Sequence, residues 1–408
     1  MLMSALRAPC AALLVACILA TAASAQQPVP LAQLQGAAED GMAEAQFRLA
    51  EALRAGSGVP QSYAKAARWY QASADQGFAP ALNGLAGLYA AGLGVERDPA
   101  LAFELTAKAA ETGSAEFVHN LASLHESGVG TAQDPARAAE LYERAAAAGY
   151  QEAAVALGVL YQGGIGVEQD IQRALELYQG PAEAGHPRAQ NNLGLIYSRG
   201  EGIATDYEQA VKWFSRAAEQ GLPTALKNLG VMYENGFGVE LDEDEAKRLY
   251  RLAAQISGGA VAADAGGTPV LPLIFDARLA PPDPRRLDQY LIAARAGDPV
   301  AQFLIGYLSA STAQSAAEYR VAAGWFARAA ESGAPAAMAN LGLLQFEGKG
   351  ALQDFVEGYK WLSLAAISGL PGVSALRDRL AERMTPDQIN AANALAEAEW
   401  AARRAAEE

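Results

Sequence analysis

Cysteine, histidine and positive charge are all scarce in this chain of 408 residues, and each scarcity excludes a class of protein. The two cysteines, Cys10 and Cys17, lie near the amino terminus, so the rest of the chain can form no disulfide and depends on packing for its stability. The formal net charge is −15, whereas nucleic acids and anionic membranes attract clusters of Lys and Arg. We therefore expect no nucleic-acid partner.

Long apolar runs are also missing, except at the amino terminus. There Arg7 precedes an apolar stretch over about residues 8–22, and Ala23-Ser24-Ala25 provides a small-x-small cleavage site before Gln26. This pattern predicts a signal peptide, residues 1–25, cleaved between Ala25 and Gln26, and a periplasmic or secreted product. The alternative is a lipoprotein anchored at Cys17, because Leu14-Val15-Ala16-Cys17 resembles a lipobox. No later run reaches the roughly 18–20 residues that a membrane span needs, so we expect no transmembrane segment in the mature chain.

What the sequence does have is a glycine every 36 residues, at positions 41, 77, 113, 149, 185 and 221 and again at 297, 333 and 369. Ala stands four residues past nearly every one of them, and Leu or Ile eight past. A small residue follows next, as in Gly158 and Gly194, and Tyr stands at 89, 161, 197 and 233. These positions form one stripe of a helix, and the small residue lets a neighbouring helix approach closely.

A second apolar stripe follows in each unit. Ala66, Ala102, Ala138, Ala174, Ala210 and Ala246 share one register, and Trp or Leu stands three residues later. Each unit therefore predicts a helix, a turn and a second helix, with the next opening glycine ending the second helix.

A Gly-x-Gly loop recurs between the two helices, as in Gly92-Leu93-Gly94 and Gly200-Glu201-Gly202. A dinucleotide-binding loop would need a preceding strand, and the pattern contains none, so we interpret these glycines as hairpin corners. The acceptors expected to cap the second helices are Asp98, Asp134, Asp170, Asp206, Asp242 and Asp354. Three residues later, Gln209, Glu245 and Glu357 predict capping boxes.

This pattern resembles the Sel1-like repeat, a relative of the tetratricopeptide repeat, over about residues 41–257 and 297–369. The unit that opens at Gly185 carries nearly every element of it. The resemblance implies an all-α fold, a right-handed α/α solenoid of about eight 36-residue helix-turn-helix repeats with helical caps.

The departures from the pattern divide the chain further. We expect an N-terminal capping helix within residues 26–40, a degenerate repeat or joint at 258–296 and C-terminal capping helices within 370–408, the last beginning at Thr385-Pro386. The unit that opens at Gly297 replaces its glycine hairpin with the sequence STAQSAAEY.

Candidate chemistry is sparse. His119 with Glu116 and Glu126 matches no metal-ligand spacing, so we expect neither a metal nor a cofactor. Ser62-Tyr63-Ala64-Lys65 has the Ser-x-x-Lys spacing of penicillin-binding enzymes, without the companion motifs. Ser62 also stands in the helix-cap register.

By analogy with tetratricopeptide arrays, the residues three, six, ten, thirteen and fourteen past the opening glycine face the concave wall. The candidates for partner binding are Glu44, Phe47, Glu51, Arg54, Asn83, Glu116, His119, Glu126, Glu152, Gln162, Arg188, Asn191, Arg199, Lys227, Glu234 and Asn235. Their mixed charges predict a protein or peptide partner.

The sequence therefore predicts a non-catalytic scaffold or adaptor of the bacterial cell envelope. An envelope hydrolase or β-lactam-binding protein that uses Ser62 and Lys65, and a structural spacer, are the alternatives.

Overall fold

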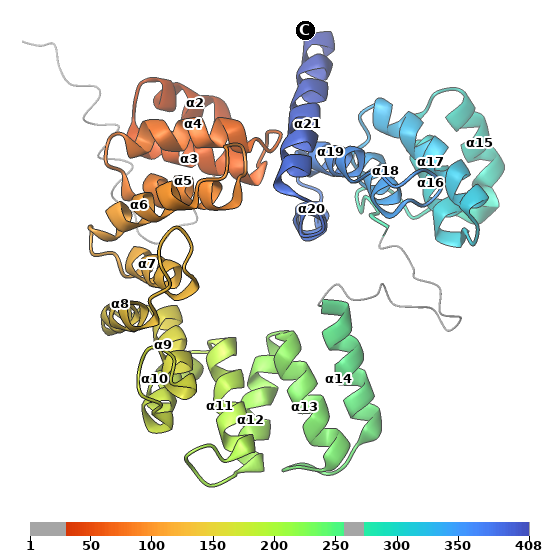
Figure 1. The fold of residues 1–408 in the computed structure, drawn as a ribbon. Coiled ribbons are helices and arrows are strands. Elements are labelled where there is room, and N and C mark those ends of the chain that lie inside the picture. Colours follow the sequence, from red (N-terminus) through yellow and green to blue (C-terminus); the bar gives the residue numbers. More distant parts are fainter. Residues whose placement is uncertain (1–29, 257–272, 408) are drawn as a thin grey trace, which may run out of the picture.

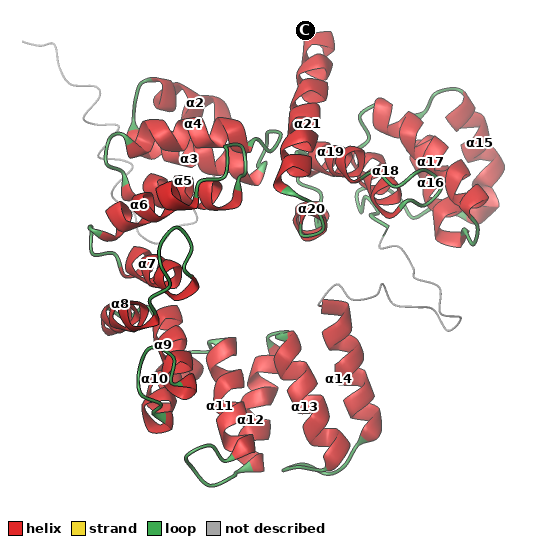
Figure 2. Ribbon diagram, in the orientation of Figure 1, coloured by secondary structure: helices red, strands yellow, loops and turns green. Residues whose placement is uncertain are grey.

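The computed structural model describes residues 30–256 and 273–407, and every regular element within these ranges is a helix (Figure 2). The predicted signal peptide, its cleavage site and the lipobox lie outside the described residues. The α-helices of the first array are α2 (Leu31–Glu39), α3 (Ala43–Ala55), α4 (Tyr63–Ala74), α5 (Ala79–Ala91), α6 (Pro99–Ala110), α7 (Ala115–Ser127), α8 (Pro135–Ala147), α9 (Gln151–Gly163), α10 (Ile171–Glu183), α11 (Pro187–Arg199), α12 (Tyr207–Glu219), α13 (Pro223–Asn235) and α14 (Glu243–Ile256).

The second array is shorter. After the 3₁₀ turn η1 (Pro284–Arg286) it contains α15 (Leu287–Arg295), α16 (Pro299–Thr312), α17 (Ala316–Glu331), α18 (Pro335–Glu347), α19 (Phe355–Ala366), α20 (Val373–Ala381) and α21 (Pro386–Glu407). Consecutive helices pack against each other from α2 to α14 and from α15 to α20, and α21 packs against α19. The all-α solenoid is thereby confirmed.

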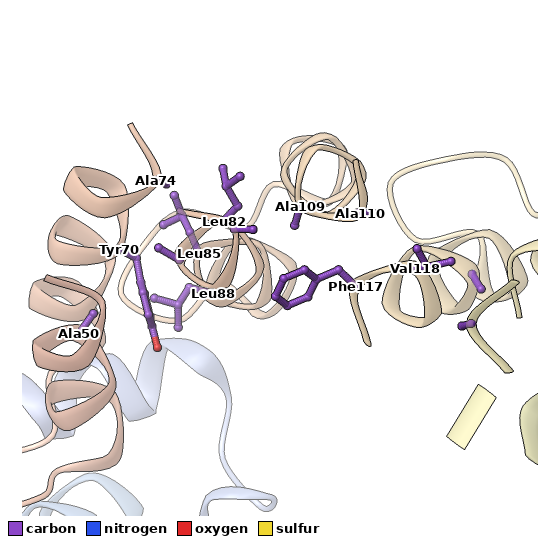
Figure 3. Packing of buried hydrophobic residues seen from close by; sticks show 14 of the residues in the cluster. Ala50, Tyr70, Ala74, Leu82, Leu85, Leu88, Ala109, Ala110, Phe117 and Val118 are labelled. Atoms are coloured by element: carbon purple, nitrogen blue, oxygen red, sulfur yellow. The ribbon is translucent and has the colours of Figure 1, made fainter. Parts of the chain in front are cut away.

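Packing within a repeat depends on the small residue of the first helix. A Cβ added to Gly194 would lie 2.5 Å from the ring of Phe214 in the second helix, so no larger residue fits without a shift. Figure 3 shows how the core continues between repeats, with Tyr70 of α4 beside Leu85 and Leu88 of α5. These three side chains are buried. Apolar packing of this kind therefore stabilises the array across the boundary between the first two repeats.

The Gly-x-Gly loop turns a corner and also joins one repeat to the previous one. Gly92 ends α5 in the left-handed conformation, with φ of 71°. Gly94 has the same positive φ, and a Cβ there would lie 2.2 Å from the carbonyl carbon of Tyr63 in the preceding repeat. The second glycine is therefore required by stacking as well as by backbone conformation.

The predicted aspartates cap the second helices, but the predicted capping boxes do not form. Asp206 accepts a hydrogen bond from the backbone N–H of Gln209 at 3.0 Å. The capping boxes expected at Gln209, Glu245 and Glu357 are wrong, because the cap residue's own N–H is already used. Asp206 N–H, for example, donates to Tyr197 O at 2.9 Å. A capping box forms instead at Ser315 and Glu318, in the repeat without glycine corners.

The arrays curve until the carboxyl-terminal helices reach the first repeats (Figure 1). Arg377 Nη2 of α20 donates to Ala55 O at the end of α3, at 3.1 Å. Asn390 of α21 accepts from Gly94 N–H at 2.8 Å and donates to Gly92 O at 3.1 Å. We call these bonds, together with Tyr359–Gln61 and Lys65–Glu397, the closing contact. It joins segments about 300 residues apart in the sequence.

Candidate partner-binding surface

The first helices carry a row of polar side chains that the second helices hold in place. The Tyr142 hydroxyl donates to Glu126 Oε2 at 2.7 Å, and Tyr250 donates to Glu234 Oε2 at 2.8 Å. Burial and this hydrogen bond raise the pKa of Tyr250 to about 12. These predicted binding residues are therefore part of the repeat's own polar framework.

In the same row, a tyrosine of the second helix pairs with a Glu or Gln that stands 16 residues earlier, on the first helix. The sequence analysis missed this relationship. Tyr178 donates to Gln162 Oε1 at 3.1 Å, again across 16 residues of sequence. Where the tyrosine register holds Thr106 or Phe214, the partner register holds Ala90 or Ser198, which have no carboxylate or amide. A comparison of the registers across repeats could have revealed this pairing.

The first repeat uses a different arrangement. Glu51 accepts a hydrogen bond from the Tyr70 hydroxyl and forms an ion pair with Arg54 at 2.7 Å. Burial alone would raise the pKa of Glu51, but the hydrogen bonds from Arg54 and Tyr70 outweigh it and lower that pKa. Phe47 packs against Tyr70 and Phe78, with ring centroids 6.0 and 5.5 Å away.

Two asparagine pairs link the first helices of consecutive repeats. Asn120 Nδ2 of α7 donates to Asn83 Oδ1 of α5 at 3.0 Å. Asn228 Nδ2 of α13 donates to Asn191 Oδ1 of α11 at 2.9 Å. Asn83 and Asn120 are both half-buried. The predicted residues Asn83 and Asn191 thus lie at the seams between repeats, on the face that the first helices share.

His119 lies between two tyrosine rings. Its ring centroid is 5.1 Å from those of Tyr142 and Tyr150, and burial lowers its pKa against the opposing charges of Glu152 and Glu126. Among the residues the structure describes, no group of three or more His, Cys, Asp or Glu side chains could hold a metal ion.

The other two histidines also have packing or capping contacts. His125 packs edge-on against Phe103, with ring centroids 5.2 Å apart. His186 is the cap of α11, since its Nδ1 accepts from Ala189 N–H at 3.3 Å.

The remaining candidates are exposed. Glu44 pairs with Arg48 at 2.6 Å, Arg199 with Glu201 at 3.2 Å, and Asn235 donates to Val231 O at 2.9 Å. Of the candidates for partner binding, those with exposed side chains are Glu44, Arg54, Glu116, Glu152, Arg188, Arg199, Lys227, Glu234 and Asn235. Their role in binding stays a prediction.

Ser62 and Lys65 have structural partners. The Ser62 hydroxyl oxygen accepts from Lys65 N–H at 3.3 Å and caps α4, and only 2% of Ser62 is exposed. Lys65 Nζ forms an ion pair with Glu397 of α21. A cleft of about 700 Å³ lies beside them, between the loops of the first repeats and α21. The lysine ammonium is therefore part of the closing contact. The sequence analysis did not identify the carboxyl-terminal residues of this contact.

This architecture defines a helical repeat protein of the solenoid class. The chain belongs to the Sel1 repeat family. The Sel1 repeat matches it over more than half of its length, at residues 43–78, 79–114, 115–150, 151–186, 187–222, 223–256, 299–333 and 335–370. Within the described ranges, no helix is both long and apolar enough to cross a membrane.

The chain is also similar to several solved structures. A Sel1 repeat protein from Oxalobacter formigenes is 30% identical, over 55% of this chain and 89% of its own, with a TM-score of 0.51. A protective antigen of uropathogenic Escherichia coli with an SLR fold is 25% identical, over 90% of this chain and 94% of its own, with a TM-score of 0.44. An immunity protein of Pseudomonas aeruginosa is 25% identical, over 52% and 81%, with a TM-score of 0.38. No curated protein matches this chain.

Proposed function

We propose that this protein is a non-catalytic scaffold of the bacterial cell envelope that binds a protein or peptide partner along the shared face of its first helices. Sel1 repeat proteins are generally protein-interaction scaffolds. The observation that carries the proposal is the Asn191–Asn228 bond, which joins two first helices into one continuous polar face. Arg188 and Lys227 are exposed on those two helices.

Affinity capture from an envelope extract tests this proposal. The variant replaces Arg188, Arg199 and Lys227 with Ala, because these cations are exposed and their loss leaves the Asn191–Asn228 bond in place. The matched control replaces three exposed cations of second helices, Arg144, Lys212 and Arg251. We expect the first variant to lose a specific partner that the wild type and the control retain.

Two results would favour the alternatives. If no specific partner is captured, or if both variants lose it equally, the structural spacer becomes the better interpretation. Turnover of a chromogenic β-lactam that disappears in Ser62→Ala would favour the hydrolase. The capping role of Ser62 and the Lys65–Glu397 ion pair favour the scaffold over that alternative.

Export is part of the same proposal and rests on the signal-peptide pattern of residues 1–25. Amino-terminal sequencing of the exported protein should begin at Gln26. A lipidated product whose formation depends on Cys17, tested with Cys17→Ser, would replace cleaved export with lipid anchoring.

A further inference from the structure

Residues 273–279, which we call the strap, lie across α16 and α18 like a bound peptide. Ile274 N–H donates to Asn340 Oδ1 at 2.8 Å, and Asn340 Nδ2 donates to Ile274 O at 2.7 Å. One buried amide of α18 therefore binds both backbone hydrogen-bonding groups of a single strap residue. Residues 273–276 belong to no regular element, so their backbone relies on such partners.

The strap side chains add apolar contacts. The Phe275 ring lies 5.9 Å from that of Phe303 and 5.1 Å from that of Tyr307, centroid to centroid, both on α16. Leu273, Ile274 and Leu279 also pack against the apolar core of the second array. Asp276 ends the extended part, since its backbone O accepts from Leu279 N–H at 2.9 Å and its side chain pairs with Arg278 at 2.6 Å.

Two registers explain why the strap lies here. Asn340 stands at the same position in its repeat as Asn120 and Asn228. The Nδ2 atoms of those two residues donate hydrogen bonds to an asparagine of the preceding repeat. In the second array that preceding position is Phe303. Asn340 therefore has no amide neighbour, and both of its polar atoms bind the strap, while Phe303 offers an aromatic surface beside them.

In the second array, the face that the registers predict to bind partners is less exposed than in the first array. Leu343 is only 2% exposed, whereas Val159 and Val231, in the same register of the first array, are 37% and 43% exposed. Ala336 and Ala339, in two further registers of the predicted binding face, are 3% and 0% exposed. In the second array this face is thus covered.

We propose that the groove formed by α16 and α18 is a binding site for an extended peptide, and that the strap fills it in the state seen here. The partner segment has an apolar residue followed by an aromatic and an acidic residue, as in Ile274-Phe275-Asp276. It binds by displacing the strap. Asn340 forms hydrogen bonds with the peptide backbone, and Phe303 and Tyr307 pack against the aromatic side chain of the peptide. The inference deepens the proposed function by naming a partner class for one part of the first-helix face.

Fluorescence anisotropy with a labelled synthetic peptide of sequence Leu-Ile-Phe-Asp-Ala-Arg-Leu tests the site in the full mature chain. The tethered strap competes at an effective concentration of the order of millimolar, so the wild type should bind the peptide weakly. Phe275→Ala weakens the strap and should tighten peptide binding at least tenfold. Val321→Ala, which removes an exposed apolar side chain from α17, is the matched control and should leave the affinity unchanged.

Two further arms identify the contacts. Adding Asn340→Ala to the Phe275→Ala variant should weaken peptide binding at least tenfold. A peptide methylated on the isoleucine nitrogen loses the N–H that donates to Asn340 Oδ1, and should bind at least tenfold more weakly than the parent. Helical content and thermal unfolding establish that each variant is folded, and Leu273→Ala replaces Phe275→Ala if that variant does not fold.

The proposal is overturned if a folded strap variant binds the peptide no better than the wild type, or if the methylated peptide binds as well as the parent. Either result would leave the strap as a fixed part of the second array. Neither result depends on Arg188, Arg199 or Lys227, so failure here and failure of the proposed scaffold function are separate outcomes.

Discussion

The Tyr359 hydroxyl donates a hydrogen bond of 2.7 Å to Gln61 Oε1, across 298 residues of sequence. Gln61 in turn donates to Arg54 O at 2.9 Å, so the end of α3 is tied through one amide to α19. Tyr359 and Gln61 are both buried. Arg377 is buried beside them, and its Nη1 has no partner among the described residues. The closing contact is thus more polar than the repeat cores.

Removing this hydrogen bond should destabilise the closed chain. Tyr359→Phe leaves Gln61 Oε1 without its donor, and we expect a loss of about 1–2 kcal/mol in the free energy of unfolding. In a double-mutant cycle with Gln61→Met, measured by chemical denaturation, the two substitutions should couple by about 1 kcal/mol. Tyr142→Phe with Gln61→Met is the control pair and should be additive. Additivity in the first pair would contradict the Tyr359–Gln61 hydrogen bond.

The glycine corners should differ in their tolerance of a side chain. Gly94→Ala combines a positive φ with a Cβ 2.2 Å from the preceding repeat, so we expect a loss of about 3 kcal/mol or more. Gly41 also has a positive φ, but no atom lies within 4 Å of an added Cβ. Gly41→Ala should therefore cost only the backbone strain, roughly 1–2 kcal/mol. Equal losses in thermal unfolding would show that the corner does not touch the preceding repeat.

Capping gives a second paired comparison. Asp206→Ala removes the acceptor for Gln209 N–H and should cost about 1 kcal/mol of stability. Gln209→Ala should cost much less, because Asp206 N–H already donates to Tyr197 O and has no need of the glutamine side chain. Denaturant midpoints of the two variants check this order. A larger loss of stability for Gln209→Ala would indicate that Gln209 forms the capping box after all.

Acid should selectively remove the contribution of Glu51. Its pKa is lowered in the folded chain, so the unfolded chain takes up the proton first as the pH falls. The stabilisation is fully present above the unfolded pKa, about 4.3, and is lost as the pH falls through the folded pKa. The melting temperature of wild type should exceed that of Glu51→Gln at pH 7, and the difference should shrink below about pH 4. A difference that stays constant between pH 7 and pH 3 would contradict the assignment.

The periodic features were predictable because they are local. The spacing of the opening glycines, the small residue at Gly194 and the cap at Asp206 recur in most units and depend on neighbours within one unit. The strap and the closing contact depend on long-range contacts, such as that between Ile274 and Asn340, and the sequence carries no periodic signal for them. The predicted binding residues were placed by register alone, which did not distinguish the exposed Arg188 from Glu126, bound to Tyr142.

Photo-crosslinking in the envelope tests the binding face most directly. A photoreactive amino acid replaces Arg188 or Lys227 on the first helices in two variants, and the exposed Lys212 on a second helix in a third. We predict that the same partner crosslinks at Arg188 and at Lys227 and is absent at Lys212. Crosslinking of that partner at Lys212 alone would contradict binding along the first helices.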